Sequence, residues 1–144
     1  MPDADTGEFD GEAVLRAGDF RALAMANPDL APYGAAASQT VEALGLTEAL
    51  SEKVVYGQNV GQALALVASR NAELGFVAAS QASSDAMAGK GGVWNVPDTL
   101  HDPIRQDLVL MRHAAGNDAA LDFITFLRGD KARAIMREHG YGNG

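Results

Sequence analysis

Short apolar runs alternate with stretches of helical periodicity along most of this chain. Five runs, bounded by turn-forming residues, predict strands at Phe20–Ala26, Glu52–Gly57, Glu73–Ser80, Gly92–Pro97 and Ile104–Ala114. The third run is nearly all apolar, as expected for a strand that is covered on both faces. Apolar residues at helical spacing predict helices at Gly34–Leu44, Asn59–Ala72, Asn117–Leu127 and Lys131–His139. Strands and helices therefore alternate along the chain.

This alternation predicts an α/β fold, with a mixed, mostly parallel sheet of about five strands flanked by helices. We expect residues 1–14 to form a flexible acidic segment, although "GEAVLRAG" can hold a helical turn. Residues 15–114 are predicted to form an α/β ligand-binding lobe, and residues 115–144 a C-terminal helical segment. In such sheets, ligands bind at the carboxyl ends of the strands, near helix N-termini.

Two strand-to-helix junctions are candidate anion sites: Pro32-Tyr33-Gly34-Ala35-Ala36 and Gly57-Gln58-Asn59-Val60-Gly61. A helix leaves its first N–H groups without intrahelical acceptors, and its N-terminus carries partial positive charge. Small neighbours let a ligand approach, so an anion can bind there without lysine or arginine. The alternative is that both are ordinary capped helix starts.

Charge and composition exclude several function classes. The net charge of −8 argues against nucleic acid as a partner, because neutralising phosphates requires clustered Lys and Arg. The absence of cysteine excludes disulfides, thiol nucleophiles and zinc–thiolate sites. The acidic N-terminus has no apolar segment typical of a signal peptide. We therefore expect a cytoplasmic protein or one from which a leader has been removed.

The sequence gives little support for other kinds of catalytic or metal-binding site. The three histidines, His101, His113 and His139, are far apart and form no metal-binding pattern. Ser83 and Ser84 lack the GxSxG elbow of serine hydrolases. The acidic residues near the N-terminus lack the spacing of a calcium loop. An enzyme that uses His101 or His113 with a nearby aspartate is a remote alternative.

Three blocks of the sequence resemble the periplasmic molybdate-binding proteins of ABC transporters. They are "ANPDLAPYGAAASQTVEALGL", "EKVVYGQNVGQALALVASRNAELGFVAAS" and "PIRQDLVLMRHAAGNDAALDFITFLRGDKARAIMREHGYG". The resemblance covers nearly the whole chain from Gly11 onward. It implies one lobe of a type II periplasmic binding protein, in which two lobes close on molybdate or tungstate. It also implies a periplasmic location, an ABC transporter permease as partner, no cofactor and no enzymatic activity.

The resemblance also assigns the site residues. Backbone N–H groups of Tyr33 and Val60 are expected to hold the oxyanion, supported by Gly34, Asn59 and Ala78. Ala78 stands where some family members have a tyrosine hydroxyl, so that donor is missing here. Nothing before Gly11 matches the family's first lobe, which supplies the remaining donors. The chain thus resembles the second lobe and the C-terminal return segment, and we expect it to bind molybdate weakly or not at all by itself.

Several alternatives stay open at this point. The oxyanion can be sulfate or phosphate, because neutral N–H donors do not select ligands by charge alone. The chain can be a truncated lobe that binds no ligand of its own. It can also be a cytoplasmic effector-sensing domain of the same fold, although no helix-turn-helix segment is present. The C-terminal helices are expected to expose apolar faces, which favours a homodimer, with a domain-swapped form as one option.

Overall fold

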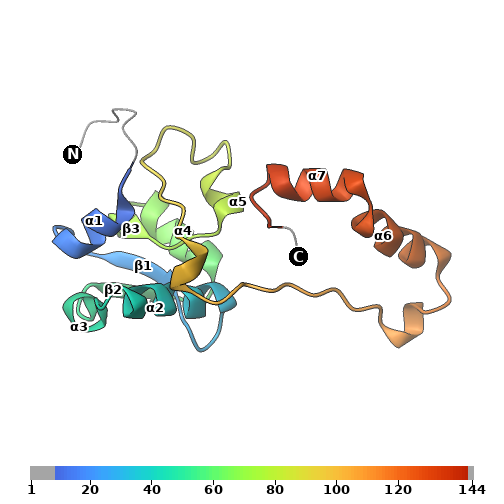
Figure 1. Cartoon of the computed structure of the whole chain (residues 1–144), viewed down its shortest axis with the longest axis horizontal. Coiled ribbons are helices and arrows are strands. Elements are labelled where there is room, and N and C mark those ends of the chain that lie inside the picture. The colour runs from blue at the N-terminus through green and yellow to red at the C-terminus, as the bar shows by residue number, and fades with distance from the viewer. Residues whose placement is uncertain (1–8, 143–144) are drawn as a thin grey trace. The chain divides into compact units, whose positions relative to one another are not determined.

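The computed structural model describes residues 9–142. Its contacts divide the chain after Ile104 into two compact units, which are described separately. The first unit contains α1 (Gly11–Ala17), β1 (Leu23–Ala26), α2 (Pro32–Ala43), α3 (Thr47–Leu50), β2 (Val54–Gly57), α4 (Val60–Ala68), β3 (Leu74–Gly75), α5 (Ala79–Ala82) and η1 (Asp98–Leu100) (Figure 1). The helix α1 occupies the stretch in which the sequence allowed a helical turn. Residues 1–8 of the predicted flexible segment lie outside the described residues.

The sheet has the strand order β2-β1-β3, and both of its strand pairs are parallel. The α/β class is confirmed, but the prediction of about five strands is wrong, since the described residues form three. The segments 92–97 and 104–114 have the composition of strands, yet neither pairs with any described strand. Composition alone does not make a strand, because a ladder needs a partner with which to exchange hydrogen bonds.

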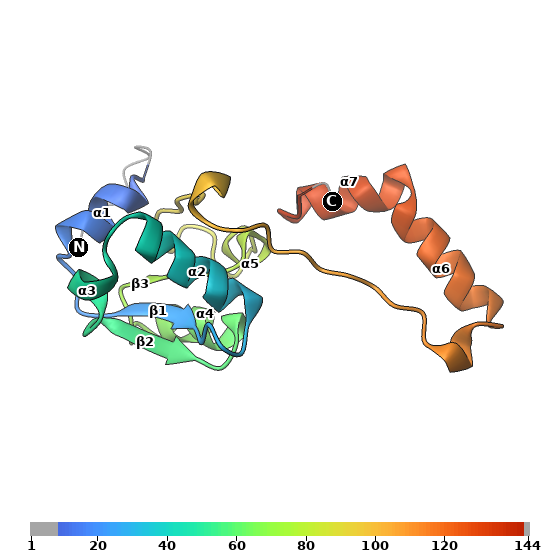
Figure 2. The same cartoon turned by 60° about the horizontal axis from the view of Figure 1, so that its bottom comes forward.

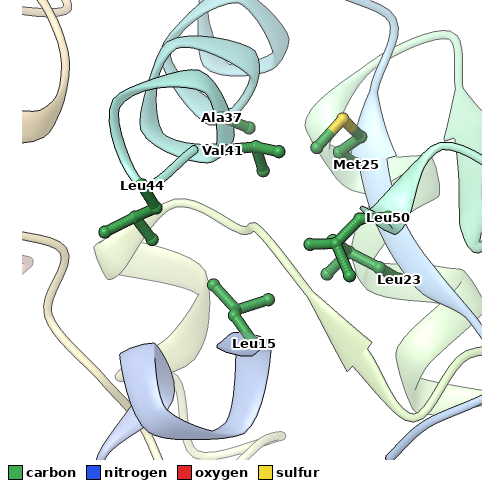
Figure 3. Close-up of a cluster of buried hydrophobic side chains, with 7 residues drawn as sticks. All are labelled: Leu15, Leu23, Met25, Ala37, Val41, Leu44 and Leu50. Carbon is green, nitrogen blue, oxygen red and sulfur yellow. The ribbon is translucent and has the colours of Figure 1, made fainter. Parts of the chain in front are cut away.

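The central strand β1 separates two layers of helices, as Figure 2 shows. Leu23 and Met25 face α2 and join the larger core cluster with Leu15, Ala37, Val41, Leu44 and Leu50 (Figure 3). Ala22 and Ala24 face the opposite layer, where they pack with Ala63 of α4 and with Ala72. The alternation of side chains along a strand therefore gives β1 one large-residue face and one alanine face.

The alanine face brings α4 close to the sheet. Ala24 and Ala63 are both fully buried. A Cβ atom added at Gly75 of β3 would lie 2.5 Å from a methyl carbon of Val67 in α4. These small residues fix how near the helix approaches the strands, and hence where the first turn of α4 lies.

Four elements are shorter than the sequence predicts: β1 and β2 begin at Leu23 and Val54 rather than at Phe20 and Glu52, and α4 and β3 end early. The helix α4 ends at Ala68 rather than Ala72, because Arg70 takes a left-handed conformation with φ of 62°. The strand β3 contains only Leu74 and Gly75 instead of the predicted Glu73–Ser80. The chain beyond it turns into α5, a short helix that the sequence did not predict.

The second unit contains η2 (Arg112–Ala114), α6 (Asp118–Arg128) and α7 (Asp130–Glu138). The side chain of Asn117 caps α6 by accepting from the N–H of Ala120. The two helices pack on each other, but Ala132 is the one buried residue among those described in this unit. Four large apolar side chains of α6 and α7 are more than 40% exposed: Leu121, Phe123, Phe126 and Ile135. The predicted domain boundary between residues 114 and 115 stays a prediction.

Candidate oxyanion site

Both candidate junctions leave the same edge of the sheet. Residues 23–26 of β1 lie beside residues 54–57 of β2 in parallel register, so that Ala26 is paired with Gly57. The ladder extends one step further, because the N–H of Asn27 donates to the carbonyl of Gly57 at 2.7 Å. The strand β3 is also parallel to β1. The chain segments that follow all three strands therefore begin at one edge, where such folds bind ligands.

The first junction is held together by Asn27. Its side-chain oxygen accepts from the N–H of Asp29 at 2.9 Å, and its carbonyl accepts from Leu30 and Ala31. The helix α2 then begins at Pro32, whose fixed φ suits the first helical position. Tyr33 is the second residue of α2 and so lies in the first turn, at the positive end of the helix dipole.

Gly34 lets α2 begin directly over the end of β1. A Cβ atom at this position would overlap the carbonyl oxygen of Ala26 and would lie 2.7 Å from the carbonyl carbons of Ala26 and Asn27. The N–H of Gly34 donates to the carbonyl of Ala31 at 2.9 Å. The contacts of Gly34 are therefore those of a packing residue that positions the first turn of α2.

The second junction is a closed network of side-chain caps. Asn59 precedes α4, and its side-chain oxygen accepts from the N–H of Gln62 at 3.0 Å. The side-chain oxygen of Gln62 in turn accepts from the N–H of Gln58 at 2.8 Å. Gly57 has no space for a side chain, since a Cβ atom there would lie 2.8 Å from Cβ of Gln62. Sequence reasoning missed Gln62, although the spacing N-x-x-Q resembles a capping box and could have indicated it.

These caps leave two N–H groups available. Among the residues that the structure describes, no hydrogen bond is donated by the N–H of Val60 or Gly61. Gly61 is exposed and Val60 is half-buried, so solvent reaches this helix start. The first turns of α2 and α4 contain no acidic residue, although Asp29 lies in the loop before α2. The start of α4 thus offers two adjacent donors with no opposing charge in its own turn.

Ala78 follows β3 and is buried. Its N–H donates to the side-chain oxygen of Gln81 at 3.1 Å, and its methyl group has no hydrogen-bonding atom. In this conformation Ala78 therefore contributes neither a free N–H nor a hydroxyl. Of the residues named from the sequence, Gly34 and Ala78 donate their N–H groups within the chain, whereas the described residues accept no hydrogen bond from the N–H of Val60.

His101 belongs to neither junction. His101 and Asp102 line a shallow hollow against α2, but Nδ1 of His101 contacts the backbone carbonyl of Asp102 rather than its carboxylate. One carboxylate oxygen of Asp102 accepts from the side-chain amide of Gln39 at 3.0 Å. A second hollow is lined by Tyr56, Gln62 and Leu66, and neither hollow includes Tyr33 or Val60.

Within residues 9–142, no cluster of three or more His, Asp or Glu side chains is arranged to bind a metal ion. No helix in the same range has the length and apolar character that crossing a membrane requires.

Two curated proteins are similar to this chain over most of its length. The molybdate-binding protein ModA of Azotobacter vinelandii is 47% identical over 133 residues, which are 92% of this chain and 53% of that protein. The molybdate-binding protein ModA of Rhodobacter capsulatus is 39% identical over 140 residues, covering 96% of this chain and 54% of that protein. The chain thus spans about half the length of the curated relatives it matches.

A solved structure is also similar to this chain. The Azotobacter vinelandii periplasmic molybdate-binding protein superimposes with a TM-score of 0.81 at 36% identity, over 91% of this chain and 58% of that chain. Residues 1–142 match the family described as bacterial extracellular solute-binding protein. With this family match and the likeness to the molybdate-binding proteins, the chain belongs to the bacterial extracellular solute-binding proteins and shares the fold of a type II periplasmic binding protein.

Proposed function

We propose that this chain supplies part of a binding site for a tetrahedral oxyanion, molybdate or tungstate, in the solute-binding component of an ABC transporter. The observation that carries the proposal is the start of α4, where the N–H groups of Val60 and Gly61 are available at the carboxyl edge of the sheet. The names of the relatives support molybdate as the ligand. By the same likeness, Tyr33 contributes its backbone N–H and not its ring.

The proposed site is incomplete in this chain. An oxyanion on the start of α4 is open to water, and water competes with each donor. Charge-assisted hydrogen bonds are worth about 1.5–3 kcal/mol each when water is excluded, and less when it is not. We therefore expect the isolated chain to bind molybdate with a dissociation constant weaker than about 1 µM, a limit that corresponds to −8.2 kcal/mol.

A proline at position 60 tests the donor directly. Val60→Pro removes one N–H but keeps the helix, because proline suits the first helical position and Asn59 is already extended, with φ −151° and ψ 171°. Val60→Ala is the matched control, since it shortens the side chain and keeps the N–H. In a ¹⁵N NMR titration with sodium molybdate, we expect saturable shifts at Val60, Gly61 and Tyr33.

The two variants separate the outcomes. Val60→Pro is expected to weaken binding about tenfold or more, as the loss of one charge-assisted bond predicts, while Val60→Ala binds like the parent chain. Equal affinities for the two variants would show that the N–H of residue 60 is not a donor. Sub-micromolar affinity of the parent chain for molybdate would refute the proposal that the site in this chain is incomplete. Tungstate is expected to bind like molybdate, because neutral donors do not distinguish two similar dianions.

The remaining parts of the proposal follow from the same likeness. We propose a non-enzymatic role, a periplasmic location and an ABC permease as partner, because the relatives are named as periplasmic or solute-binding proteins.

A homodimer also stays a prediction, supported by Phe123 and Phe126 of α6, which are 55% and 44% exposed. A monomeric mass in light scattering at high protein concentration would contradict it.

A further inference from the structure

The hydrogen bonds that hold the start of α4 meet in one residue, Gln62. Its N–H donates to the side-chain oxygen of Asn59 at 3.0 Å, and its side-chain oxygen accepts from the N–H of Gln58 at 2.8 Å. The side chain of Gln62 has room to lie there because Gly57 has no Cβ atom, which would lie 2.8 Å from Cβ of Gln62. Gln62 therefore fixes the two residues that come before the available N–H groups of this helix.

The same cap is connected to the start of α2. The carbonyl of Gly57 accepts from the N–H of Asn27 at 2.7 Å, and the carbonyl of Asn27 accepts from the N–H of Ala31, the residue before α2, at 3.0 Å. Gln62 thus lies at one end of a path of covalent and hydrogen bonds that joins the two candidate junctions.

The acidic residues at helix starts follow a pattern along the described part of the chain. The helices α1, α3, α6 and α7 each have an acidic residue in the first turn: Glu12, Glu48, Asp118 and Asp130. The helices α2, α4 and α5, which follow the three strands of the sheet, have none. An acidic residue is favourable at this position, because it complements the helix dipole. In a chain with 19 acidic residues, its absence from these three starts is consistent with an anion site at that edge of the sheet.

Gln62 is the position at which this choice of residue is clearest. It is the third residue of α4, and a capping box takes either glutamine or glutamate there. Both side chains offer an oxygen to the N–H of Gln58, but glutamate also adds a negative charge that the helix dipole stabilises. Helix stability by itself therefore favours glutamate at position 62.

We propose that Gln62 is a positioning and specificity-determining residue of the oxyanion site, because it holds the start of α4 with a neutral cap and so preserves the affinity for a dianion. The inference rests on the proposed function. A carboxylate at position 62 would repel an oxyanion bound one turn away, since like charges at such distances repel measurably even in water. The amide provides the same cap without that repulsion.

The substitution Gln62→Glu tests the neutral cap. It keeps an oxygen for the N–H of Gln58, so the urea midpoint should equal or exceed that of the parent chain. In the ¹⁵N NMR titration with sodium molybdate at low salt, we expect a dissociation constant about tenfold higher, from the repulsion between a carboxylate and a dianion. The difference should shrink as sodium chloride is added, because salt screens exposed charges.

Ala68→Glu is the matched control for the added charge. Ala68 is exposed and lies six residues further along the same helix (68 − 62), which places it roughly 9 Å away along the axis. This variant has the same net charge as Gln62→Glu and should bind molybdate like the parent chain.

Gln62→Met tests the positioning role, since methionine has a similar length but lacks the oxygen that accepts from Gln58. The amide of Gln58 should exchange faster in this variant than in the parent chain, and should stay protected in Gln62→Glu. Molybdate should bind to Gln62→Met more weakly than to the parent chain, by a ratio that salt does not change. A residue with a purely structural role would not keep the cap and lose the affinity, as we expect for Gln62→Glu.

The outcomes distinguish this inference from the proposed function. Equal molybdate affinity of Gln62→Glu and the parent chain at low salt would overturn the inference and leave the proposed function standing. An equal loss of affinity in Ala68→Glu would also overturn it, because net charge alone would then explain the effect. A parent chain without saturable molybdate shifts would refute the proposed function and this inference together.

Discussion

Gly34 is the residue at which local preference and packing oppose each other most clearly. Within a helix, alanine is more favourable than glycine by about 1 kcal/mol. A Cβ atom at Gly34, however, would overlap the carbonyl of Ala26, which belongs to a buried central strand that cannot move aside. We expect Gly34→Ala to destabilise the chain by about 1–3 kcal/mol in urea unfolding, since steric overpacking exceeds the gain in propensity.

Gly91→Ala provides the control for this prediction. A Cβ atom at Gly91 meets no other atom within 4 Å, and its φ is not in the left-handed region. Its unfolding free energy is expected to stay within about 0.5 kcal/mol of the parent value. Equal effects of the two substitutions would mean that the close approach of α2 to β1 does not exist in solution.

The Glu73 carboxylate gives the stability of the sheet a dependence on pH. Its pKa lies below the ordinary value of 4.5, first because the N–H of Ala22 donates to it at 2.9 Å, with a smaller contribution from the Arg21 guanidinium at 3.4 Å. Because the folded pKa is lowered, the stabilisation is complete above pH 4.5 and is lost as the pH falls through the folded pKa.

Glu73→Gln should therefore lower the urea midpoint near neutral pH, and the difference from the parent chain should shrink as the pH falls through the lowered pKa of Glu73. Arg21→Ala should have a smaller effect that added salt removes, because this ion pair is exposed. A Glu73→Gln difference that stays constant with pH would show that the charge of the carboxylate does not matter.

At the scale of elements, the cap of α4 is the feature that connects stability with the candidate site. Asn59→Ala removes the oxygen that accepts from the N–H of Gln62. The substitution should cost about 1 kcal/mol in urea unfolding, the usual value of an N-cap. Asn59→Ser keeps a capping oxygen and should recover most of the loss. A serine variant as unstable as the alanine variant would indicate that Asn59 acts through some other contact.

The elements also show which structural information the sequence contains locally. The strands β1 and β2 and the helices α2 and α4 were predictable, because apolar pattern, Asn59 and Pro32 act within a few residues. The end of α4 was not, since it depends on the left-handed conformation of Arg70. The segments 92–97 and 104–114 were predicted as strands from composition, but a strand also needs a pairing partner, which no local pattern identifies.

The candidate site was also predictable only where a local sequence signal determines the structure. The donor of Val60 could be located from its place after an N-cap, because helix starts have known geometry. The engagement of the Ala78 N–H by Gln81 could not, since a side-chain rotamer decides it. The roles of Gly57 and Gly34 depend on the distance between a helix and a strand, which no local pattern encodes.

At the scale of the whole molecule, the two units should differ in local stability. The first unit has both buried clusters, whereas Ala132 is the one buried residue described in the second. We expect amides of β1 to exchange at least about 100-fold more slowly than those of α6 and α7, because opening α6 and α7 exposes little apolar surface. Equal protection in α6 and β1 would show that the second unit is stabilised by contacts not yet identified.

The parallel register of the sheet has a consequence for biosynthesis. Leu23 pairs with Val54 and with Leu74, which follow it by 31 and 51 residues (54 − 23 and 74 − 23). At a translation rate of roughly 5–20 residues per second, β1 waits about 3–10 seconds after its own synthesis before its second neighbour has even been made. During that interval the most apolar strand of the sheet has no native cover on one side. The nascent chain is therefore most in need of chaperone protection between the translation of Ala26 and that of Gly75.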